Sequence, residues 1–332
     1  MIKEDCITEL THILNQIPYG KLQLEKHSSH SSKTFFIDYS QKQVDGKGKI
    51  DIFPLFPGIE LAFYYLLAEK QCDCHSAASH ILELNYCRAG RIGWNMKEGM
   101  SVYLGAGDLS IHTMDCCASS IISYPLGYFS GITIYIDLDI FTINIPDLLK
   151  EAGINGQTLR TQFCSSHKPF TIPLCKETDN IFSSFYNLPE PIKIPFYKLK
   201  TQELLLFLSM QANNRQSKPS ISCQTDLIKE IHTFLTKHLD QRFTIEDLSK
   251  QYHINTSSLK ADFKTVYGKP IAAYMKEYRI RQSIKLLLET NHSIASIASQ
   301  VGYESQSKFS RAFKEFTQIL PTEYRNNHIS TK

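Results

Sequence analysis

Two stretches in the last third of this 332-residue chain repeat one order of helix-capping residues, apolar residues and turns. No other feature constrains the fold as strongly. In the first stretch, Thr244 can cap a short helix over 245–251, with Asp247 three residues later as its acidic partner. Thr256 then caps a second helix, which Gly268 ends. This pattern predicts a helix-turn-helix.

The second stretch follows the same plan 49 residues later. Ser293 caps a helix over 294–300, Gly302 suits the tight turn, and a further helix covers about 305–316. A long amphipathic helix over 271–290 joins the two stretches. If this helix is rigid, both second helices can enter successive major-groove faces of DNA, about 34 Å apart.

Side chains that point away from each apolar core can reach base edges, where Gln suits adenine and Arg or Lys suits guanine. Helix starts and nearby cations suit phosphates. The predicted DNA-binding residues are Thr256, Ser257, Lys260, Ala261, Lys264, Arg281, Ser305, Gln306, Ser307, Lys308 and Arg311. The alternative for each position is a solvated polar residue, and for the region it is a helical bundle without a nucleic-acid role.

The distribution of charge agrees with a polyanionic partner for this region. Residues 221–332 hold 16 Lys and Arg against 11 Asp and Glu, a net charge of +5, whereas the rest of the chain carries −2. A basic segment on a slightly acidic body favours contact with nucleic acid, although solvated helical faces also carry such an excess.

The N-terminal part of the chain has a different pattern. From about residue 50 to 139, short apolar runs are interrupted by Gly, Pro and Asp, which predicts many short strands in a small barrel or two-sheet sandwich. Helices are expected near 6–16 and over 196–210. The second of these has apolar residues on more than one face, so it is expected to be buried or to pair with a partner chain.

The predicted fold class is therefore α+β, with strands in the N-terminal part and only helices in the C-terminal part. The stretch 212–222 is short and polar, so it is the predicted linker. The predicted domains are 1–211, for effector sensing and dimerisation, and 223–332, for DNA binding.

The apolar and turn positions of the C-terminal part have a dense counterpart in a known family. These positions are Ser293, Ile294, Ile297, Ala298, Val301, Gly302, Tyr303, Glu304, Ser305, Phe309, Ser310, Phe313, Lys314, Pro321, Tyr324 and Arg325. With them, the last hundred residues resemble the AraC/XylS family of transcription regulators. The first stretch matches more loosely, and Ser283 stands where the family usually has Ala. The resemblance implies a DNA-binding regulator with two helix-turn-helix units.

The stretches 83–91, 103–110 and 124–132 are similar to the siderophore-responsive, PchR-like branch of that family. This resemblance implies a cupin-like β-barrel with flanking helices that senses a small effector. The residues expected to line its effector pocket are Tyr86, Arg88, Trp94 and Tyr103. The alternative is ordinary strand packing with a surface charge.

Cysteine and histidine residues gather at Cys72–His75, at His80, and at His112 with Cys116 and Cys117. Their spacing lacks the second ligand pair of a zinc site, so we expect thiols without a metal and predict no cofactor. The rival interpretation is a cupin-type metal-dependent enzyme, or a cysteine-based alkyl-transfer protein, with an appended helical domain. We predict that the protein is not an enzyme.

The predicted partners are double-stranded promoter DNA, a small-molecule effector, a second copy of the chain in a homodimer, and RNA polymerase. The chain has no run of roughly 18 apolar residues and no apolar segment at its acidic start. A membrane partner is therefore not expected, and the predicted location is the cytoplasm.

Overall fold

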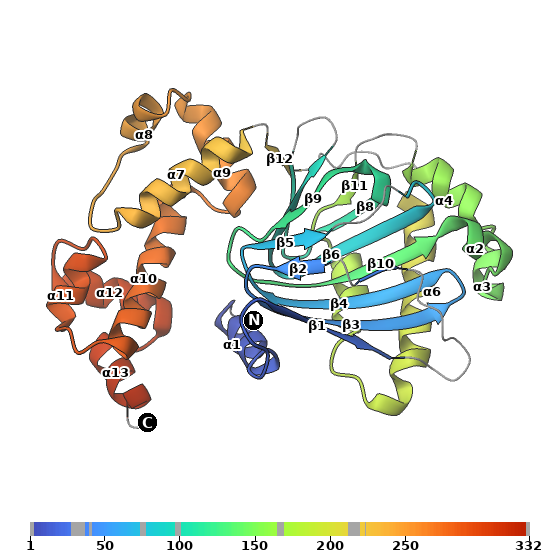
Figure 1. The fold of residues 1–332 in the computed structure, drawn as a ribbon, viewed down its shortest axis with the longest axis horizontal. Helices are drawn as coiled ribbons and strands as arrows, with labels where there is room; N and C mark the ends of the chain where they lie inside the picture. Colours follow the sequence, from blue (N-terminus) through green and yellow to red (C-terminus); the bar gives the residue numbers. More distant parts are fainter. Residues whose placement is uncertain are drawn as a thin grey trace. The chain divides into compact units, whose positions relative to one another are not determined.

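The computed structural model describes residues 3–27, 37–39, 42–73, 78–96, 101–164, 169–211, 220–222 and 224–329. The chain divides into an N-terminal unit, Met1–Cys223, and a C-terminal unit, Gln224–Lys332 (Figure 1). Most of the predicted linker, 212–219, lies outside the described residues. Its last residues form a strand, β12 (Ser220–Ser222), which pairs with β7 of the N-terminal unit.

The N-terminal unit is built on a sheet with twelve strands in the described residues. The strands are β1 (Lys21–Lys26), β2 (Lys42–Val44), β3 (Lys47–Phe56), β4 (Ile59–Leu67), β5 (Lys70–Asp73), β6 (Ile81–Met96), β7 (Ser101–Gly105), β8 (Leu109–Thr113), β9 (Cys117–Ser123), β10 (Phe129–Asp137), β11 (Phe170–Ile172) and β12. Their order is β1-β3-β4-β10-β6-β9-β5-β2. In addition, β7 and β8 pair with β6, β11 pairs with β8, and β12 pairs with β7. Since β1 and β2 lie in contact, the sheet is a nearly closed barrel, which confirms the predicted architecture.

Strand β6 belongs to both halves of this barrel. Its first half pairs with β10 and β8, and its second half with β7 and β9. Arg88 is an extra residue in the pairing with β10, because Gly131 is opposite Cys87 and Ser130 is opposite Ala89. Such a β-bulge reverses which residues of the strand face each side of the sheet.

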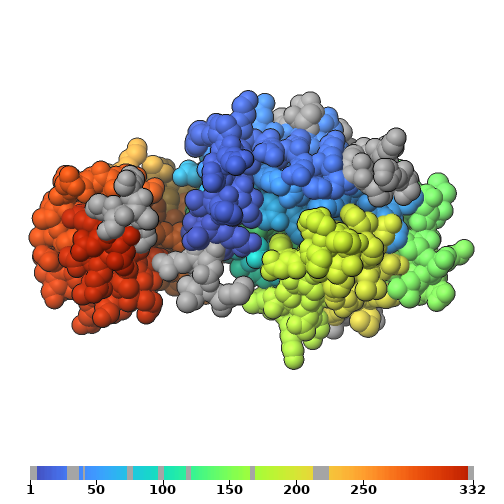
Figure 2. All heavy atoms as spheres, turned by 90° about the horizontal axis from the view of Figure 1, so that it is seen from below, coloured from blue at the N-terminus to red at the C-terminus, as the bar shows by residue number. Residues whose placement is uncertain are grey.

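Two apolar cores use the two faces of the sheet. One face packs against helices and includes Leu82, Leu84 and Tyr86, and the other forms the barrel interior and includes Ile92 and Trp94. The helices of this unit are α1 (Lys3–Ile13), α2 (Leu138–Ile143), α3 (Asp147–Glu151), α4 (Gly156–Phe163), α5 (Lys176–Ser183) and α6 (Lys193–Met210), with 3-10 turns η1 (Met114–Cys116) and η2 (Glu190–Ile192). In Figure 2, the N-terminal segment and the helices of 176–210 cover neighbouring parts of the visible face of this unit.

The C-terminal unit is helical throughout its described residues. Its helices are α7 (Thr225–Lys237), α8 (Ile245–Gln251), α9 (Thr256–Tyr267), α10 (Ile271–Glu289), α11 (Ile294–Gln300), α12 (Gln306–Thr317) and α13 (Pro321–Ile329). Helices α8 and α9 form the first helix-turn-helix motif, and α11 and α12 form the second, joined by α10 (Figure 1). Both predicted motifs are confirmed.

Helix spacing explains the core of each motif. In the first motif, Leu259 and Phe263 are four residues apart on α9 and fully buried. In the second, Phe309 and Phe313 repeat that spacing on α12 and pack with Ile280 of α10. None of the helices in the described part of the chain has the length and hydropathy needed to cross a bilayer.

Candidate nucleic-acid interface

The first helix-turn-helix motif begins with a reciprocal cap. Thr244 Oγ1 accepts a hydrogen bond from the Asp247 amide at 3.1 Å, and the Asp247 carboxylate accepts one from the Thr244 amide at 3.0 Å. This bonding lowers the pKa of Asp247. The second helix, α9, is capped by Asn255, which accepts bonds from the amides of Ser257 and Ser258. Thr256, predicted as that cap, is instead the first helical residue.

The outward face of α9 contains most of the predicted contact residues. Ser257, Lys260, Ala261 and Lys264 are exposed, and Thr256 is half-buried. Because the buried Leu259 and Phe263 occupy the opposite face, the exposed residues form one surface along the helix. The surface is polar and basic, as base and phosphate contacts require.

The second motif presents the corresponding surface on α12. Ser305, predicted as the first residue of this helix, is its N-cap and accepts a hydrogen bond from the Lys308 amide. Its neighbours Gln306 and Ser307 are exposed, as are Lys308 and Arg311. The Arg311 side chain is 85% exposed.

Ion pairs orient the basic side chains around α12. Arg311 Nε lies 3.6 Å from a Glu315 oxygen, Lys276 Nζ of α10 bonds the other oxygen at 2.8 Å, and Lys308 pairs with Glu304. Hydrogen bonds from Lys276 and Lys308 lower the pKa values of Glu315 and Glu304. Exposed pairs of this kind contribute little to stability, because water and salt screen them.

The two motifs are joined by more than helix α10. Arg242, in the loop before α8, donates from Nε to the Gly302 carbonyl in the turn of the second motif at 3.3 Å. Arg279 of α10 donates to the carbonyls of Leu239 and Gln241 in the same loop, at 3.1 and 2.7 Å. A Cβ added at Gly302 would lie 2.1 Å from the Leu239 oxygen. The loop therefore packs directly on the turn, and the motifs form one block.

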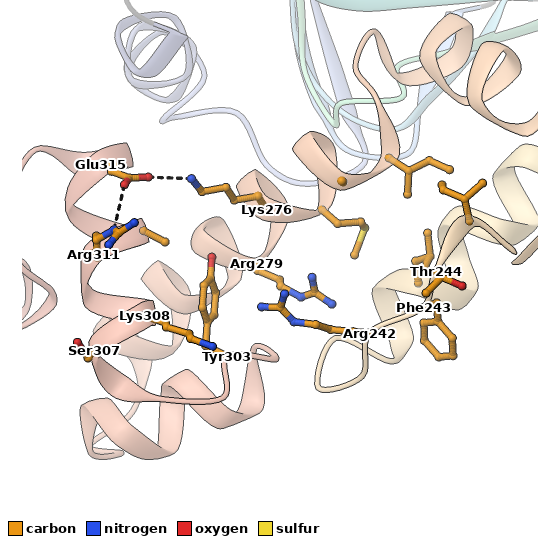
Figure 3. Close-up of a pocket in the computed structure, with 16 residues that line it drawn as sticks. Arg242, Phe243, Thr244, Lys276, Arg279, Tyr303, Ser307, Lys308, Arg311 and Glu315 are labelled. Carbon is orange, nitrogen blue, oxygen red and sulfur yellow. Dashed lines mark hydrogen bonds and ion pairs between the residues drawn. The ribbon is translucent and has the colours of Figure 1, made fainter. Parts of the chain in front are cut away.

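An open cleft of about 800 Å³ lies between the motifs (Figure 3). It is lined by Leu235, Arg242, Phe243, Thr244, Ile245, Ile271, Ala272, Met275, Lys276, Arg279, Tyr303, Ser307, Lys308, Arg311, Ala312 and Glu315. A second hollow beside it includes Arg242, Ser305 and Gln306. Ser307, Lys308 and Arg311 of α12 thus line the cleft, and the N-cap Ser305 and Gln306 line the hollow.

Four residues of the cleft were not predicted as DNA contacts from the sequence: Arg242, Lys276, Arg279 and Tyr303. Figure 3 shows the guanidinium groups of Arg242 and Arg279 side by side, with the Tyr303 ring next to them. Burial lowers the pKa of Arg279, and the positive charge of Arg242 lowers it further. Arg281, which was predicted as a contact, is half-buried on α10 and does not line the cleft.

The four predicted effector-pocket residues do not gather in one place. Tyr86 stacks on Phe182 in the core beneath the helices, with 3.9 Å between the ring centroids. Trp94 stacks on His112 in the barrel interior, with 5.1 Å between the ring centroids. The bulge at Arg88 places Tyr86 and Trp94 on opposite faces of β6. Arg88 itself pairs with Glu9 and lies over the ring of Tyr186, and Tyr103 packs on Gly93.

The cysteine and histidine residues that were weighed as metal ligands contact other side chains. His112 Nε2 lies 3.3 Å from Glu83, Cys116 lies 3.2 Å from Thr113 Oγ1, and His80 faces Asp137. Cys74 and His75 lie outside the described residues.

Within the described residues, a different trio has the spacing of metal ligands: Glu25, His27 and Asp51, with ligand atoms within 4.8 Å of one another. The ammonium group of Lys49 already binds Glu25 at 2.7 Å and Asp51 at 3.0 Å. The two carboxylates therefore have a cationic partner within the protein, and we assign them no metal.

Comparison with known proteins agrees with the two-motif architecture. Residues 248–327 match the helix-turn-helix domain family. The chain is 29% identical over 128 residues to the transcriptional activator RhaR of Mannheimia succiniciproducens, covering 39% of this chain and 45% of RhaR. It is 30% identical over 124 residues to the arabinose operon regulatory protein of Escherichia coli, covering 37% and 41%. The chain thus spans less than half the length of these two relatives.

A longer similarity exists to the thermoregulatory protein LcrF of Yersinia pestis, at 23% identity over 73% of this chain and 88% of LcrF. Similar solved structures include the C-terminal domain of AraT from Geobacillus stearothermophilus, at 27% identity over 32% of this chain and 88% of that domain, with a TM-score of 0.30. Another is ToxT from Vibrio cholerae, at 15% identity over 81% and 98%, also with a TM-score of 0.30.

The paired motifs and these sequence matches define the C-terminal unit as a helix-turn-helix domain. Over the matched residues, the C-terminal unit is similar to the helix-turn-helix domains of these regulators. These two relatives are named as a transcriptional activator and an operon regulatory protein.

Proposed function

We propose that this protein regulates transcription by binding promoter DNA through α9 and α12, one in each of two adjacent major grooves. The observation that carries the proposal is the direct contact between the motifs. The Arg242–Gly302 and Arg279–Leu239 contacts hold two exposed, basic helices in one block. A two-motif block of this kind can read two half-sites about one helical turn apart.

A titration of the full chain with labelled duplex DNA tests this function. We expect affinity to fall linearly on logarithmic axes as salt rises, because bound phosphates release counterions. We also expect some promoter sequences to compete far better than scrambled duplexes of equal length. Equal competition by every duplex would contradict sequence-specific regulation.

We further propose that a small effector binds in the barrel interior. Two buried N–H groups there, Trp94 Nε1 and Gln71 Nε2, have no hydrogen-bond partner in the described part of the chain. Both residues are in register with Ile122 on β9, so they share one row across the sheet. A ligand with acceptor oxygens would satisfy both groups, which favours a polar effector.

The resemblance to the siderophore-responsive branch directs us to iron-chelating molecules as the first effectors to test. Trp94 is the only tryptophan of the chain, so its fluorescence reports binding directly. Saturable quenching by an iron-chelate, lost in Gln71→Leu, would support the site. A genome-wide map of bound sites, compared with and without iron limitation, would show whether that effector class controls promoter occupancy; identical maps would oppose it.

The homodimer also enters as a proposal. Helix α6 buries Tyr197, Leu204, Leu205 and Leu208 in the core beneath the sheet but leaves Leu199 54% exposed. We propose that a second copy of the chain covers this exposed side chain. Light scattering of the wild type and Leu199→Glu tests it, and a monomeric wild type would reject it. RNA polymerase as a partner and the cytoplasm as the location are further proposals, and both depend on promoter binding.

A further inference from the structure

Two of the cations that line the cleft between the motifs, Arg242 and Arg279, differ from the others in their partners. Lys276 and Arg311 both pair with Glu315, and Lys308 pairs with Glu304. Across residues 224–329, Arg242 and Arg279 form no salt bridge, and their hydrogen bonds go only to backbone carbonyls. The two guanidinium groups therefore repel each other, while Arg242 also interacts at longer range with the Glu304 carboxylate.

The two arginines differ in the number of side-chain nitrogens that already donate hydrogen bonds. Arg279 uses Nε and Nη2 for the loop before α8, so it mainly supports the fold. Arg242 is exposed and uses only Nε, which leaves its two terminal nitrogens without a hydrogen-bond partner among residues 224–329. It also lines both the cleft and the neighbouring hollow, next to the start of α12.

Two adjacent guanidinium groups, one partly buried, suit an anion with several oxygens, because arginine binds phosphate through paired N–H donors. We propose that Arg242, positioned beside Arg279, binds a phosphate in the cleft between the two motifs. The inference rests on the proposed function and deepens it. The phosphate belongs to the DNA backbone between the two major-groove contacts, and a free phosphate compound is the other source of the same chemistry.

The position of the cleft favours the DNA backbone. Ser307, Lys308 and Arg311 of α12 line the same cleft as Arg242. A duplex with α12 in its major groove would present the phosphates that border that groove to the adjacent surface. Since Arg242 also bonds Gly302 of the second motif, a phosphate held there would contact both motifs at their junction.

The test compares three variants of the full chain in salt titrations with one duplex. Arg242→Gln removes the charge, Arg242→Lys keeps it, and Lys237→Gln removes an exposed charge on α7 that does not line the cleft. We expect Arg242→Gln to reduce the slope of log affinity against log salt by about 0.9, the value for one phosphate contact. Arg242→Lys and Lys237→Gln should keep the wild-type slope. Circular dichroism melting confirms that each variant is folded.

Two results would overturn the inference while leaving the proposed function intact. One is an unchanged slope for Arg242→Gln, and the other is an equal loss for Lys237→Gln. Inorganic phosphate, followed by 31P line broadening without DNA, separates the sources. Binding of inorganic phosphate that Arg242→Gln abolishes, with no change in the DNA slope, assigns the site to free phosphate and rejects the DNA source. A wild type that binds no duplex at all rejects the proposed function itself.

Discussion

Each helix-turn-helix motif turns twice through the left-handed backbone region, and the two motifs place different residues there. In the first motif these are His253, with φ 51°, and Gly268, with φ 76°. In the second they are Gly302, with φ 75°, and Gln318, with φ 67°. Glycine therefore occupies the turn between the two helices in the second motif. In the first motif it instead follows the last residue of α9.

Packing explains the difference at the turn. The His253 side chain is exposed, so a residue with a Cβ fits there at a backbone cost of about 1–2 kcal/mol. Gly302 lies against the Leu239 carbonyl and has no room for a Cβ. The comparison teaches that the second turn is also the docking surface for the first motif, whereas the first turn faces solvent.

Gly302→Ala is expected to have the largest effect in this comparison. The added Cβ meets a backbone oxygen and sits at positive φ, so we expect a loss of about 3 kcal/mol in the free energy of unfolding. His253→Ala, the matched control, should change it by less than about 0.5 kcal/mol. Urea unfolding followed by helical circular dichroism measures both. Similar losses for the two variants would break the proposed distinction.

Acid should destabilise the packing of α7 against the first motif, where His232 lies. Burial lowers the pKa of His232 to about 4, and its ring stacks on Tyr267. The unfolded chain takes up this proton below about pH 6.5 and the folded chain only below about 4. Stability is therefore complete above pH 6.5 and falls by up to about 3 kcal/mol as the pH drops to 4.

Unfolding of the wild type and His232→Phe across that pH range measures this loss. The variant has no group that titrates at this position, so its pH dependence should be flatter. Equal pH dependence of the two proteins would show that other groups dominate acid unfolding.

Each motif is expected to control its own half-site. Lys260→Ala and Arg311→Ala should each weaken binding by about 1–3 kcal/mol at one base position, since each removes one outward contact. The affected positions should lie in different half-sites. Binding to a set of singly substituted duplexes measures this. An equal response to both variants at every base would assign the two side chains to phosphates instead.

The smallest contrast concerns the first helices of the motifs. Thr244 caps α8 reciprocally with Asp247, while Ser293 caps α11 through a single bond to the Ser296 amide at 3.2 Å. Loss of the Ser293 cap should cost about 1 kcal/mol, and the double change Thr244→Ala with Asp247→Ala should cost more than Ser293→Ala because it removes both bonds. Chemical unfolding of both variants tests the order, and the reverse order would contradict it.

The local features of the C-terminal unit could be predicted from sequence because they depend on residues three or four apart. The Thr244–Asp247 cap and the Phe309–Phe313 spacing are examples. The junction of the motifs could not be predicted in this way. Arg242 and Gly302 are 60 residues apart, and nothing near either residue signals their contact.

The N-terminal unit shows a similar limit. Tyr86 and Trp94 are an even number of residues apart on one strand, so regular alternation predicts that they share a face. The extra residue at Arg88 reverses the alternation and separates them. Only the pairing with β10 shows this bulge, and that pairing depends on a strand about forty residues away.

The central claim is that two linked motifs bind adjacent major grooves. Selection of duplexes from a random library by the full chain, followed by sequencing, tests it most directly. We predict enriched sites with two short conserved elements whose centres are about 10 base pairs apart, one altered by Lys260→Ala and the other by Arg311→Ala. Enrichment of a single element, or none above the starting library, would contradict the account.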